Sequence, residues 1–162
     1  MKITLPLTTD RLIIKNTTKE DVDLLLKMDK QEITQKYLGG IKNKTKDERL
    51  IFLEKKENKY KDGIAYPLTV FLKDGTRIGF IDIKPVDEKL ELSYIFDYDS
   101  CNKGYCTEAC KKILDSIDNK VIFAYSLKDN ESSRRVLEKL GFKYIETVKR
   151  DDIEFLYYER EV

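Results

Sequence analysis

Residues 89 to 118 constrain the fold most, because the sequence there changes from the period of a strand to that of a helix. Apolar residues alternate over 89–96, and a helical pattern follows the segment Lys103–Ala109 (KGYCTEA). The first N–H groups of a helix have no internal partner, and the helix dipole favours negative charge beside them. Gly104 permits a tight turn, and Lys103 adds a positive charge. The segment predicts either a phosphate or pyrophosphate site or a plain connecting turn.

The remaining patterns predict a mixed sheet with helices. Strands are expected over residues 9–15, 65–72, 77–84, 89–96, 121–126, 142–148 and 153–161. Asp74 and Gly75 between two apolar runs indicate a hairpin, and residues 85–88 are expected to turn the chain into the central strand. The closing hairpin is expected to turn over residues 149–152. The order of elements favours one α/β (α+β) domain.

Capping signals place the helices. Thr17 with Glu20 and Thr45 with Glu48 have the spacing of capping boxes, so a helix is expected after each. Thr107 is a candidate cap for the central helix, which is expected to run to about residue 118. Asp129 or Asn130 is expected to cap the last helix, and Gly141 to end it.

The two faces of the central strand differ in polarity. Leu90, Leu92, Tyr94 and Phe96 share one face, whereas Lys89, Glu91, Ser93 and Ile95 share the other. Glu91 therefore points into solvent or into a polar cleft, and it is a candidate functional carboxylate.

Charge and cysteine usage exclude several classes of function. The 162 residues contain 31 Lys and Arg against 30 Asp and Glu, so no overall field favours nucleic acid or an anionic membrane. No apolar run is long enough to span a bilayer, and the N-terminus lacks a secretory pattern, so a cytoplasmic protein is expected. The chain has no histidine, and Cys101, Cys106 and Cys110 match no common zinc spacing, so no metal is expected. Reduced, packed thiols are the favoured interpretation, and a nucleophilic Cys106 is the alternative.

Three segments together resemble the GNAT acetyltransferase superfamily, and within it the ribosomal-protein-alanine type of N-acetyltransferase. They are Thr9-Asp10-Arg11-Leu12, the segment Lys103–Ala109, and Asn130-Glu131-Ser132-Ser133 with Leu137-Glu138-Lys139-Leu140-Gly141-Phe142. The resemblance implies one acetyltransferase domain over residues 1–162, with a central mixed, mostly antiparallel sheet flanked by helices.

The resemblance also implies acetyl transfer from acetyl-CoA, as co-substrate, to a primary amine by direct attack in a ternary complex. The residues that match the family's CoA-contacting positions are Ile95, Phe96 and Asp97 along the pantetheine arm, Asn102, Lys103, Gly104, Tyr105, Cys106 and Thr107 at the pyrophosphate, and Asn130 with Ser133 beside the pantetheine. A backbone N–H of the central strand is expected to donate to the thioester oxygen. Asn130 also fits a purely capping role.

The chemistry requires a base for the amine and a proton for the leaving thiolate. Glu91 matches the glutamate often found on the central strand of this subfamily, and an exposed carboxylate paired with Lys or Arg is the alternative. The position at which many relatives carry a proton-donating tyrosine holds Leu137. The Ser133 hydroxyl is then the next candidate donor, and a helix-surface serine is the alternative.

Two other functions stay open on the sequence. The absence of that tyrosine fits a catalytically inactive acyl-CoA-binding or regulatory module, and the third alternative is an interaction protein. The acceptor is a protein N-terminus or a small amine, and Asp151, Asp152 and Glu154 are candidates to attract a cationic one. The sequence leaves the oligomeric state undecided, with a homodimer among the alternatives.

Overall fold

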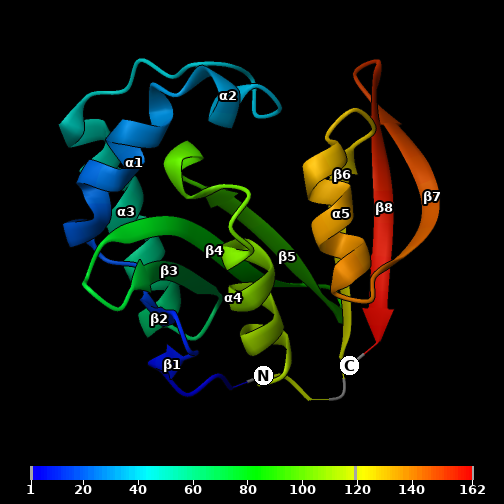
Figure 1. Ribbon diagram of the computed structural model, residues 1–162, viewed down its shortest axis with the longest axis horizontal. Helices are drawn as coiled ribbons and strands as arrows, with labels where there is room; N and C mark the ends of the chain where they lie inside the picture. Colours follow the sequence, from blue (N-terminus) through cyan, green and yellow to red (C-terminus); the bar gives the residue numbers. More distant parts are fainter. Residues whose placement is uncertain (1, 119, 162) are drawn as a thin grey trace.

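The computed structural model describes residues 2–118 and 120–161, which form one eight-stranded sheet with helices on both faces (Figure 1). The strands are β1 Leu7–Thr8, β2 Leu12–Asn16, β3 Tyr66–Leu72, β4 Arg77–Val86, β5 Lys89–Phe96, β6 Val121–Leu127, β7 Lys143–Arg150 and β8 Ile153–Glu161. The α-helices are α1 Val22–Asp29, α2 Glu32–Gln35, α3 Lys46–Lys61, α4 Tyr105–Leu114 and α5 Glu131–Lys139, with 3₁₀ turns η1 Lys19–Asp21 and η2 Tyr98–Ser100. No helix among the described residues is both long and apolar enough to cross a membrane.

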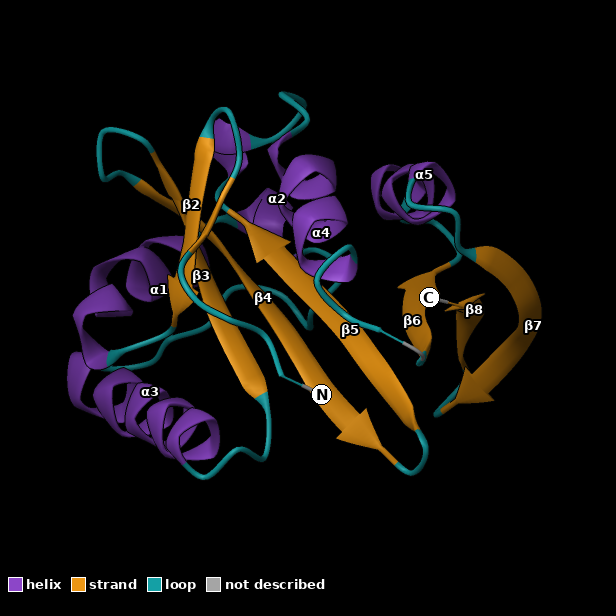
Figure 2. Ribbon diagram, turned by 90° about the horizontal axis from the view of Figure 1, so that it is seen from below, coloured by secondary structure: helices purple, strands orange, loops and turns teal. Residues whose placement is uncertain are grey.

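The sheet is mixed and mostly antiparallel, in the order β1-β2-β3-β4-β5-β6-β8-β7. Its parallel pair is β5 with β6, and this pair is short. Leu90 lies opposite Ile122 and Glu91 opposite Phe123, and the pairing goes no further although both strands continue. The two strands diverge beyond Glu91 (Figure 2). This splay splits the sheet into a β1–β5 half and a β6–β8 half, and the arrangement confirms the predicted fold class.

Different helices pack on the two faces of the sheet. Helices α4 and α5 lie on one face, where Leu92 of β5, Ile113 of α4 and Leu137 of α5 share the main core. Helices α1 and α3 lie on the opposite face of β2 to β4, and Val22 and Leu53 form a smaller core there. That face of β6 and β8 carries none of the helices in the described part of the chain (Figure 2).

Several local predictions are confirmed. Thr45 and Glu48 form the capping box of α3, and Asn130 caps α5 by accepting a hydrogen bond from the Ser133 N–H. Gly141 follows α5 with a φ of 84°, in the left-handed region that favours glycine. On β5 the alternation is as expected, because Leu90 and Leu92 are buried and Ser93 is exposed.

The first capping box was predicted one residue too early. The box uses Thr18 and Asp21 instead of Thr17 and Glu20. Asp21 is buried and accepts hydrogen bonds from Arg77 Nε (2.6 Å) and Thr69 Oγ1 (2.8 Å), so distant partners fix it at the end of the box. The hydroxyl of Thr17 is buried against Thr69 Oγ1 at 2.9 Å.

Some boundaries also differ from the prediction. The expected first strand begins at Leu12, and the short β1 and α2 carried no sequence signal that predicted them. Strand β4 continues through Val86, so its turn into β5 is reduced to two residues, with Asp87 at φ 53°. Helix α4 ends at Leu114 rather than near residue 118.

Candidate active site

The segment between β5 and α4 forms an open anion loop. Gly104 is the N-cap of α4 at φ 80°, and Asn102 also has a positive φ of 60°. The first backbone bond of the helix runs from the Glu108 N–H to the Gly104 carbonyl at 3.0 Å. The N–H groups of Tyr105, Cys106 and Thr107 therefore belong to the free first turn. No side chain caps this helix among the described residues, so the expected capping role of Thr107 is wrong.

Arg11, from the turn between β1 and β2, holds this loop from the side. Its Nη1 donates to the Lys103 carbonyl at 2.9 Å, and its Nε donates to Glu108 Oε1 at 2.8 Å. The guanidinium carbon lies 4.5 Å from the centre of the Tyr105 ring. A Cβ at Gly104 would lie 3.4 Å from Nη2 of Arg11. One side chain thus fixes the Lys103 carbonyl and the first turn of α4 together.

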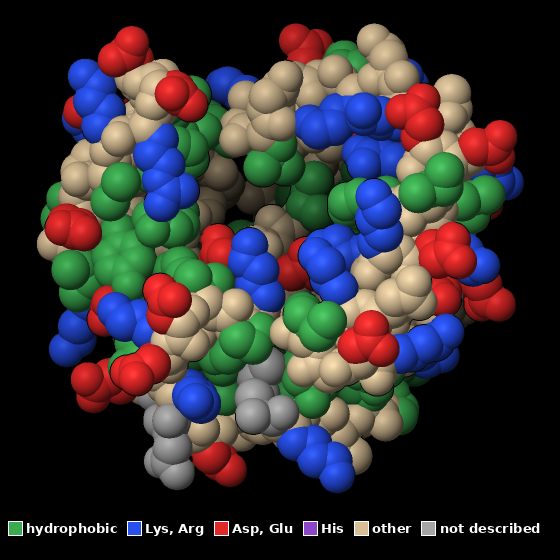
Figure 3. All heavy atoms as spheres, turned by 180° about the vertical axis from the view of Figure 1, so that it is seen from behind, with side chains coloured by type: hydrophobic (Ala, Val, Ile, Leu, Met, Phe, Trp, Pro, Cys, Tyr) green, Lys and Arg blue, Asp and Glu red, His purple; other side chains and the backbone are tan. Residues whose placement is uncertain are grey.

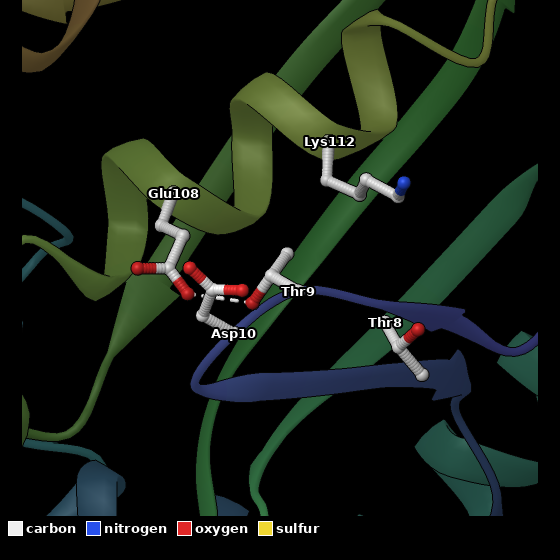
Figure 4. Close-up of a pocket in the computed structure, with 5 residues that line it drawn as sticks. All are labelled: Thr8, Thr9, Asp10, Glu108 and Lys112. Atoms are coloured by element: carbon white, nitrogen blue, oxygen red, sulfur yellow. Dashed lines mark hydrogen bonds between the residues drawn. The ribbon is translucent and has the colours of Figure 1, made fainter.

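A second contact from the same turn completes this support. Thr9 Oγ1 donates to Glu108 Oε2 at 2.5 Å, while the Thr9 Oγ1 accepts from the Leu12 N–H at 3.0 Å (Figure 4). Burial raises the pKa of Glu108, but the hydrogen bonds from Thr9 and Arg11 outweigh it, so the pKa is lowered and the group stays charged. Beside this contact lies a pocket of about 530 Å³, lined by Thr8, Thr9, Asp10, Glu108 and Lys112.

Asp97, directly after β5, connects the strand that leads into the anion loop with α1. Asp97 was predicted to contact the cofactor, but its carboxylate accepts from Lys27 Nζ at 2.8 Å and from Gln31 Nε2 at 2.5 Å. Its N–H donates to the Ile78 carbonyl at 2.8 Å. The Asp97 side chain therefore anchors α1, through Lys27, and Gln31, two residues after that helix, to the end of β5. Ile95 and Phe96, the other two predicted pantetheine contacts, lie on the diverging part of β5.

Tyr94 joins the two sides of the splay on the face of α4 and α5. Its hydroxyl lies 3.0 Å from Ser133 Oγ and 3.2 Å from the Ser133 carbonyl, at the start of α5. Burial raises the pKa of Tyr94 well above its ordinary value of 10.0, so the phenol is protonated at neutral pH. The Asn130 side chain caps α5, since its Oδ1 accepts a hydrogen bond from the Ser133 N–H at 3.3 Å.

Glu91 lies on the opposite face, where β5 and β6 separate. It is about four-fifths buried and pairs with Lys84 Nζ at 2.9 Å, across from it on β4. The pairing that the sequence offered as an alternative is therefore present, in a partly enclosed place. Ion pairs Lys56–Asp82 and Lys89–Glu159 lie on the same face. Figure 3 shows this face hollowed near its centre, with hydrophobic and charged side chains around the hollow.

The structure brings the predicted residues into three groups. Residues 102–107 form the loop, Ser133 lies across the splay beside Tyr94, and Glu91 lies on the reverse face of β5. Sequence reasoning missed two contributors, Arg11 and Tyr94. Arg11 belongs to the first motif, and Tyr94 lies on the apolar face of the central strand. No local sequence signal reveals their partners, which are 97 and 39 residues away.

The cysteines are three free thiols. A hydrogen bond with Cys110 and burial raise the pKa of Cys106 well above its ordinary value of 9.0. A raised pKa disfavours the thiolate that a nucleophile requires. These contacts favour the packed thiols expected from the sequence. No cluster of potential metal ligands occurs within residues 2–118 and 120–161.

Comparison with known proteins gives a family match and close structural likenesses. Residues 11–143 match the model of the acetyltransferase (GNAT) domain. A GNAT-family acetyltransferase from Bacillus anthracis is 20% identical, with a TM-score of 0.81 and coverage of 97% of this chain and 98% of that chain. An acetyl transferase from Salmonella typhimurium that modifies the N-terminal serine of the 50S ribosomal subunit protein L7/L12 is 14% identical, with a TM-score of 0.80 and coverage of 95% and 96%.

A third solved structure contains the co-substrate. The microcin C7 self immunity acetyltransferase MccE, in complex with acetyl-CoA and AMP, is 13% identical, with a TM-score of 0.80 and coverage of 95% of this chain and 94% of that chain. At such identities the likeness shows the fold alone. No curated protein matches the sequence significantly.

Proposed function

This chain belongs to the GNAT acetyltransferase family, and from that premise we propose that it transfers the acetyl group of acetyl-CoA to a primary amine by direct attack in a ternary complex. One observation carries the proposal for this chain. The free first turn of α4, supported by Arg11, lies at the end of the strand that diverges from β6. An anion site thus lies next to an opening between two strands. A ligand with a pyrophosphate and a long thioester arm requires both features side by side.

The loop fits the pyrophosphate of acetyl-CoA. The N–H groups of Asn102 to Thr107 are the proposed donors, and Gly104 leaves the approach to the backbone open. Lys103 adds charge at the same place, although its Nζ now donates to the Asp99 carbonyl at 2.9 Å. The pantetheine arm is proposed to lie along Ile95 and Phe96, and Asn130 to contact it while capping α5.

The splay gives the thioester access to both faces of the sheet. In the proposed reaction the amine nitrogen attacks the thioester carbon, a C–N bond forms, and the C–S bond breaks. Glu91, directly or through water, takes the proton that the amine nitrogen loses. A backbone N–H on the unpaired edge of β5 donates to the oxygen on which negative charge develops.

The thiolate leaves on the other face of the sheet. We assign its protonation to the Tyr94 and Ser133 hydroxyls, which lie together beside the splay. Tyr94 lies on β5, whereas the tyrosine of many relatives lies in the last helix, where this chain has Leu137, fully buried in the core. Its raised pKa suits a donor, because the phenol still carries its proton at neutral pH. The inactive acyl-CoA-binding module stays the alternative, because Leu137 stands where many relatives carry the proton-donating tyrosine.

The proposal is tested first by thermal unfolding with and without acetyl-CoA, followed by an assay of CoA release with a panel of primary amines. A ligand at 100 times its Kd stabilises by about 2.7 kcal/mol, which for this size raises the Tm by roughly 5–11 °C. We expect Gly104→Val to abolish the shift. Gly63→Val is the matched control, because Gly63 also has a positive φ, 68°, but follows α3.

The outcomes separate the alternatives. No shift at millimolar acetyl-CoA contradicts the enzyme and the binding module alike. A shift without turnover of any amine favours the inactive module. The acceptor is proposed to be a protein N-terminus, as for the ribosomal-protein-modifying relative, or a small amine. The single domain over residues 1–162, the cytoplasmic location, the homodimer and the lack of nucleic-acid or membrane partners stay predictions from the sequence.

A further inference from the structure

Four aromatic side chains line the face of β6 and β8 that no described helix covers. We call Phe123, Tyr125, Phe155 and Tyr157 the aromatic strip. The ring centres of Phe123 and Tyr157 are 5.5 Å apart, those of Tyr125 and Tyr157 are 5.3 Å apart, and those of Tyr125 and Phe155 are 6.4 Å apart. Alternation along the two strands points all four to one side, away from α5. Phe123 is buried, and the other three rings are partly exposed.

The aromatic strip begins beside the candidate base. Phe123 is the β6 partner of Glu91, at the last paired position before the splay. Helices α4 and α5 occupy the other face of the splay, so an amine that reaches Glu91 approaches from the face of the aromatic strip. Tyr125 is two residues beyond Phe123, or about 7 Å along the strand. The substituent carried by the attacking amine therefore lies against these rings.

The far end of the aromatic strip opens into a pocket. Leu127 continues the same face of β6, and Ile153, at the start of β8, continues that of β8 by alternation. Both line a pocket of about 550 Å³, together with Tyr37, whose hydroxyl donates to the Asp129 carbonyl at 3.1 Å. Aromatic and aliphatic side chains thus extend from Glu91 to this pocket, along the face without a helix. The other residues that line the pocket are charged: Lys128, Asp129, Lys149, Asp152 and Glu154.

Charge does not provide a competing basis for recognition here. Glu154 pairs with Lys128 at 3.6 Å, and Asp152 pairs with Lys149 at 3.7 Å, so the acidic hairpin residues have nearby cations. Arg150 lies over the Tyr125 ring, with its guanidinium carbon 4.8 Å from the ring centre, and donates to the Tyr125 hydroxyl at 3.1 Å. Lys89 Nζ likewise lies 5.7 Å from the centre of the Tyr157 ring. The path from Glu91 to the pocket therefore has an aromatic floor, with a cation over each of two rings, and paired charges at its rim.

We propose that the aromatic strip is the acceptor subsite, and that the acceptor is a primary amine with an aromatic or large apolar group close to the nitrogen. This inference rests on the proposed acetyltransferase function and names the substrate class of that site. The rings exclude water and gain contact area from the apolar group. The hydroxyls of Tyr125 and Tyr157 are already engaged with Arg150, Lys89 and Glu159, so a hydroxyl in place of the apolar group must compete for these partners. A peptide N-terminus with an apolar first residue and a free arylalkylamine share this chemistry.

The test uses two matched pairs of amines at saturating acetyl-CoA. Phenylalanine amide against serine amide represents a peptide N-terminus, and 2-phenylethylamine against 2-aminoethanol represents a free amine. We expect kcat/KM to favour the aromatic member of at least one pair by about tenfold or more. The pair with the larger preference identifies the source.

Three variants connect the preference to the aromatic strip. Tyr125→Ala is expected to reduce the aromatic-to-polar ratio to near one, while the KM for acetyl-CoA is retained. Tyr157→Phe keeps its ring and loses only hydrogen bonds with Lys89 and Glu159, so the ratio is expected to persist. Tyr144→Ala is the control on the edge strand β7, where the side chain is half exposed and contacts Thr147.

Failure of this inference and failure of the acetyltransferase function give different results. Turnover without preference for the aromatic amines, or a preference that Tyr125→Ala leaves intact, overturns the subsite and leaves the enzyme standing. If no amine turns over, calorimetric titration of phenylalanine amide, with and without CoA, decides. Binding that Tyr125→Ala weakens about tenfold supports the subsite without the enzyme, and absence of binding overturns both.

Discussion

The hydroxyl of Tyr94 lies 3.0 Å from Oγ of Ser133, so strand β5 and helix α5 meet through two hydroxyls beside the splay of the sheet. The two residues come from opposite sides of that splay, and neither predicts the other in the sequence. From the sequence, the last helix alone was expected to supply the proton donor to the thiolate, through Ser133. These hydroxyls lie on the face of β5 opposite Glu91, so in the proposed reaction the sheet separates deprotonation of the amine from protonation of the thiolate.

Removing the Tyr94 hydroxyl should slow the reaction without weakening cofactor binding. Since general acid catalysis contributes about 10²- to 10⁴-fold, and Ser133 stays in place, we expect Tyr94→Phe to lower kcat by about 10- to 100-fold. Ser133→Ala should cost less, and the double variant should cost less than the product of the two, because the hydroxyls act together. Steady-state kinetics with an unchanged Kd for acetyl-CoA checks this, and an unchanged kcat in Tyr94→Phe rules the donor out.

Arg11 should matter for binding rather than for the chemical step. Arg11→Ala removes the bonds to the Lys103 carbonyl and to Glu108, so the loop loses its lateral support. Because hydrogen bonds of charged groups contribute about 1.5–3 kcal/mol each, we expect acetyl-CoA to bind about 10- to 100-fold more weakly, with kcat at saturation retained. Calorimetry measures the Kd. Lys111→Ala is the control, because it removes a cation of α4 whose exposed pair with Asp115 lies away from the loop.

Glu91 is tested by a change that keeps its shape. Glu91→Gln removes the basic oxygen and leaves Lys84 without its partner, so we expect kcat/KM for the amine to fall by about 10²-fold or more. The residual rate should rise with pH as more amine becomes neutral. Asp82→Asn, which breaks the ion pair to Lys56 on the same face, controls for loss of a charge. Equal effects of the two substitutions would assign Glu91 a structural role.

Asp97 should make stability depend on pH. Burial raises its pKa, but hydrogen bonds from Lys27 and Gln31 outweigh burial, so the pKa lies below its ordinary value of 3.8. A carboxyl whose pKa is lower in the folded state stabilises the fold above the unfolded pKa, and loses this effect as the pH falls through the folded pKa. We therefore expect Asp97→Asn to be less stable than the wild type above about pH 5 and the difference to shrink below pH 3.8.

Urea unfolding at several pH values measures the free energy of unfolding for this comparison. Asp99→Asn is the control, because Asp99 also pairs with Lys27, at 3.2 Å, but is largely exposed. Exposed pairs contribute about 0–1 kcal/mol, so its effect should be small at every pH. A difference between wild type and Asp97→Asn that stays constant down to pH 2 would contradict the assigned ion pair.

The thiols should react in a fixed order. Cys101 is exposed, although burial of its sulfur raises its pKa above 9.0, whereas Cys110 is buried and Cys106 shares a hydrogen bond with it. We expect an aromatic disulfide reagent at pH 8 to modify one thiol in the native protein and the other two only on unfolding. Cys101→Ser should abolish the native reaction. Rapid modification of Cys106 in that variant would revive the nucleophilic interpretation.

The sequence alone was enough for features that depend on near neighbours. The alternation on β5, the Thr45–Glu48 box, the Asn130 cap and the glycine at the start of α4 all act within four residues, so their residue types predict their structure. The three motifs together predicted the family and the fold. Even here the first box slipped by one residue, because the partners that select Asp21 come from β3 and β4.

Only the tertiary structure decided which side chains meet. The carboxylate of Asp97 belongs to Lys27 and Gln31, Arg11 supports a loop more than 90 residues away, and Tyr94 meets Ser133 across the splay. Such pairs depend on the order of strands and on the helix that packs over each face. The residues next to them in the sequence therefore do not predict them. The sequence therefore determined the local elements and the family, and the packing of those elements determined the candidate site.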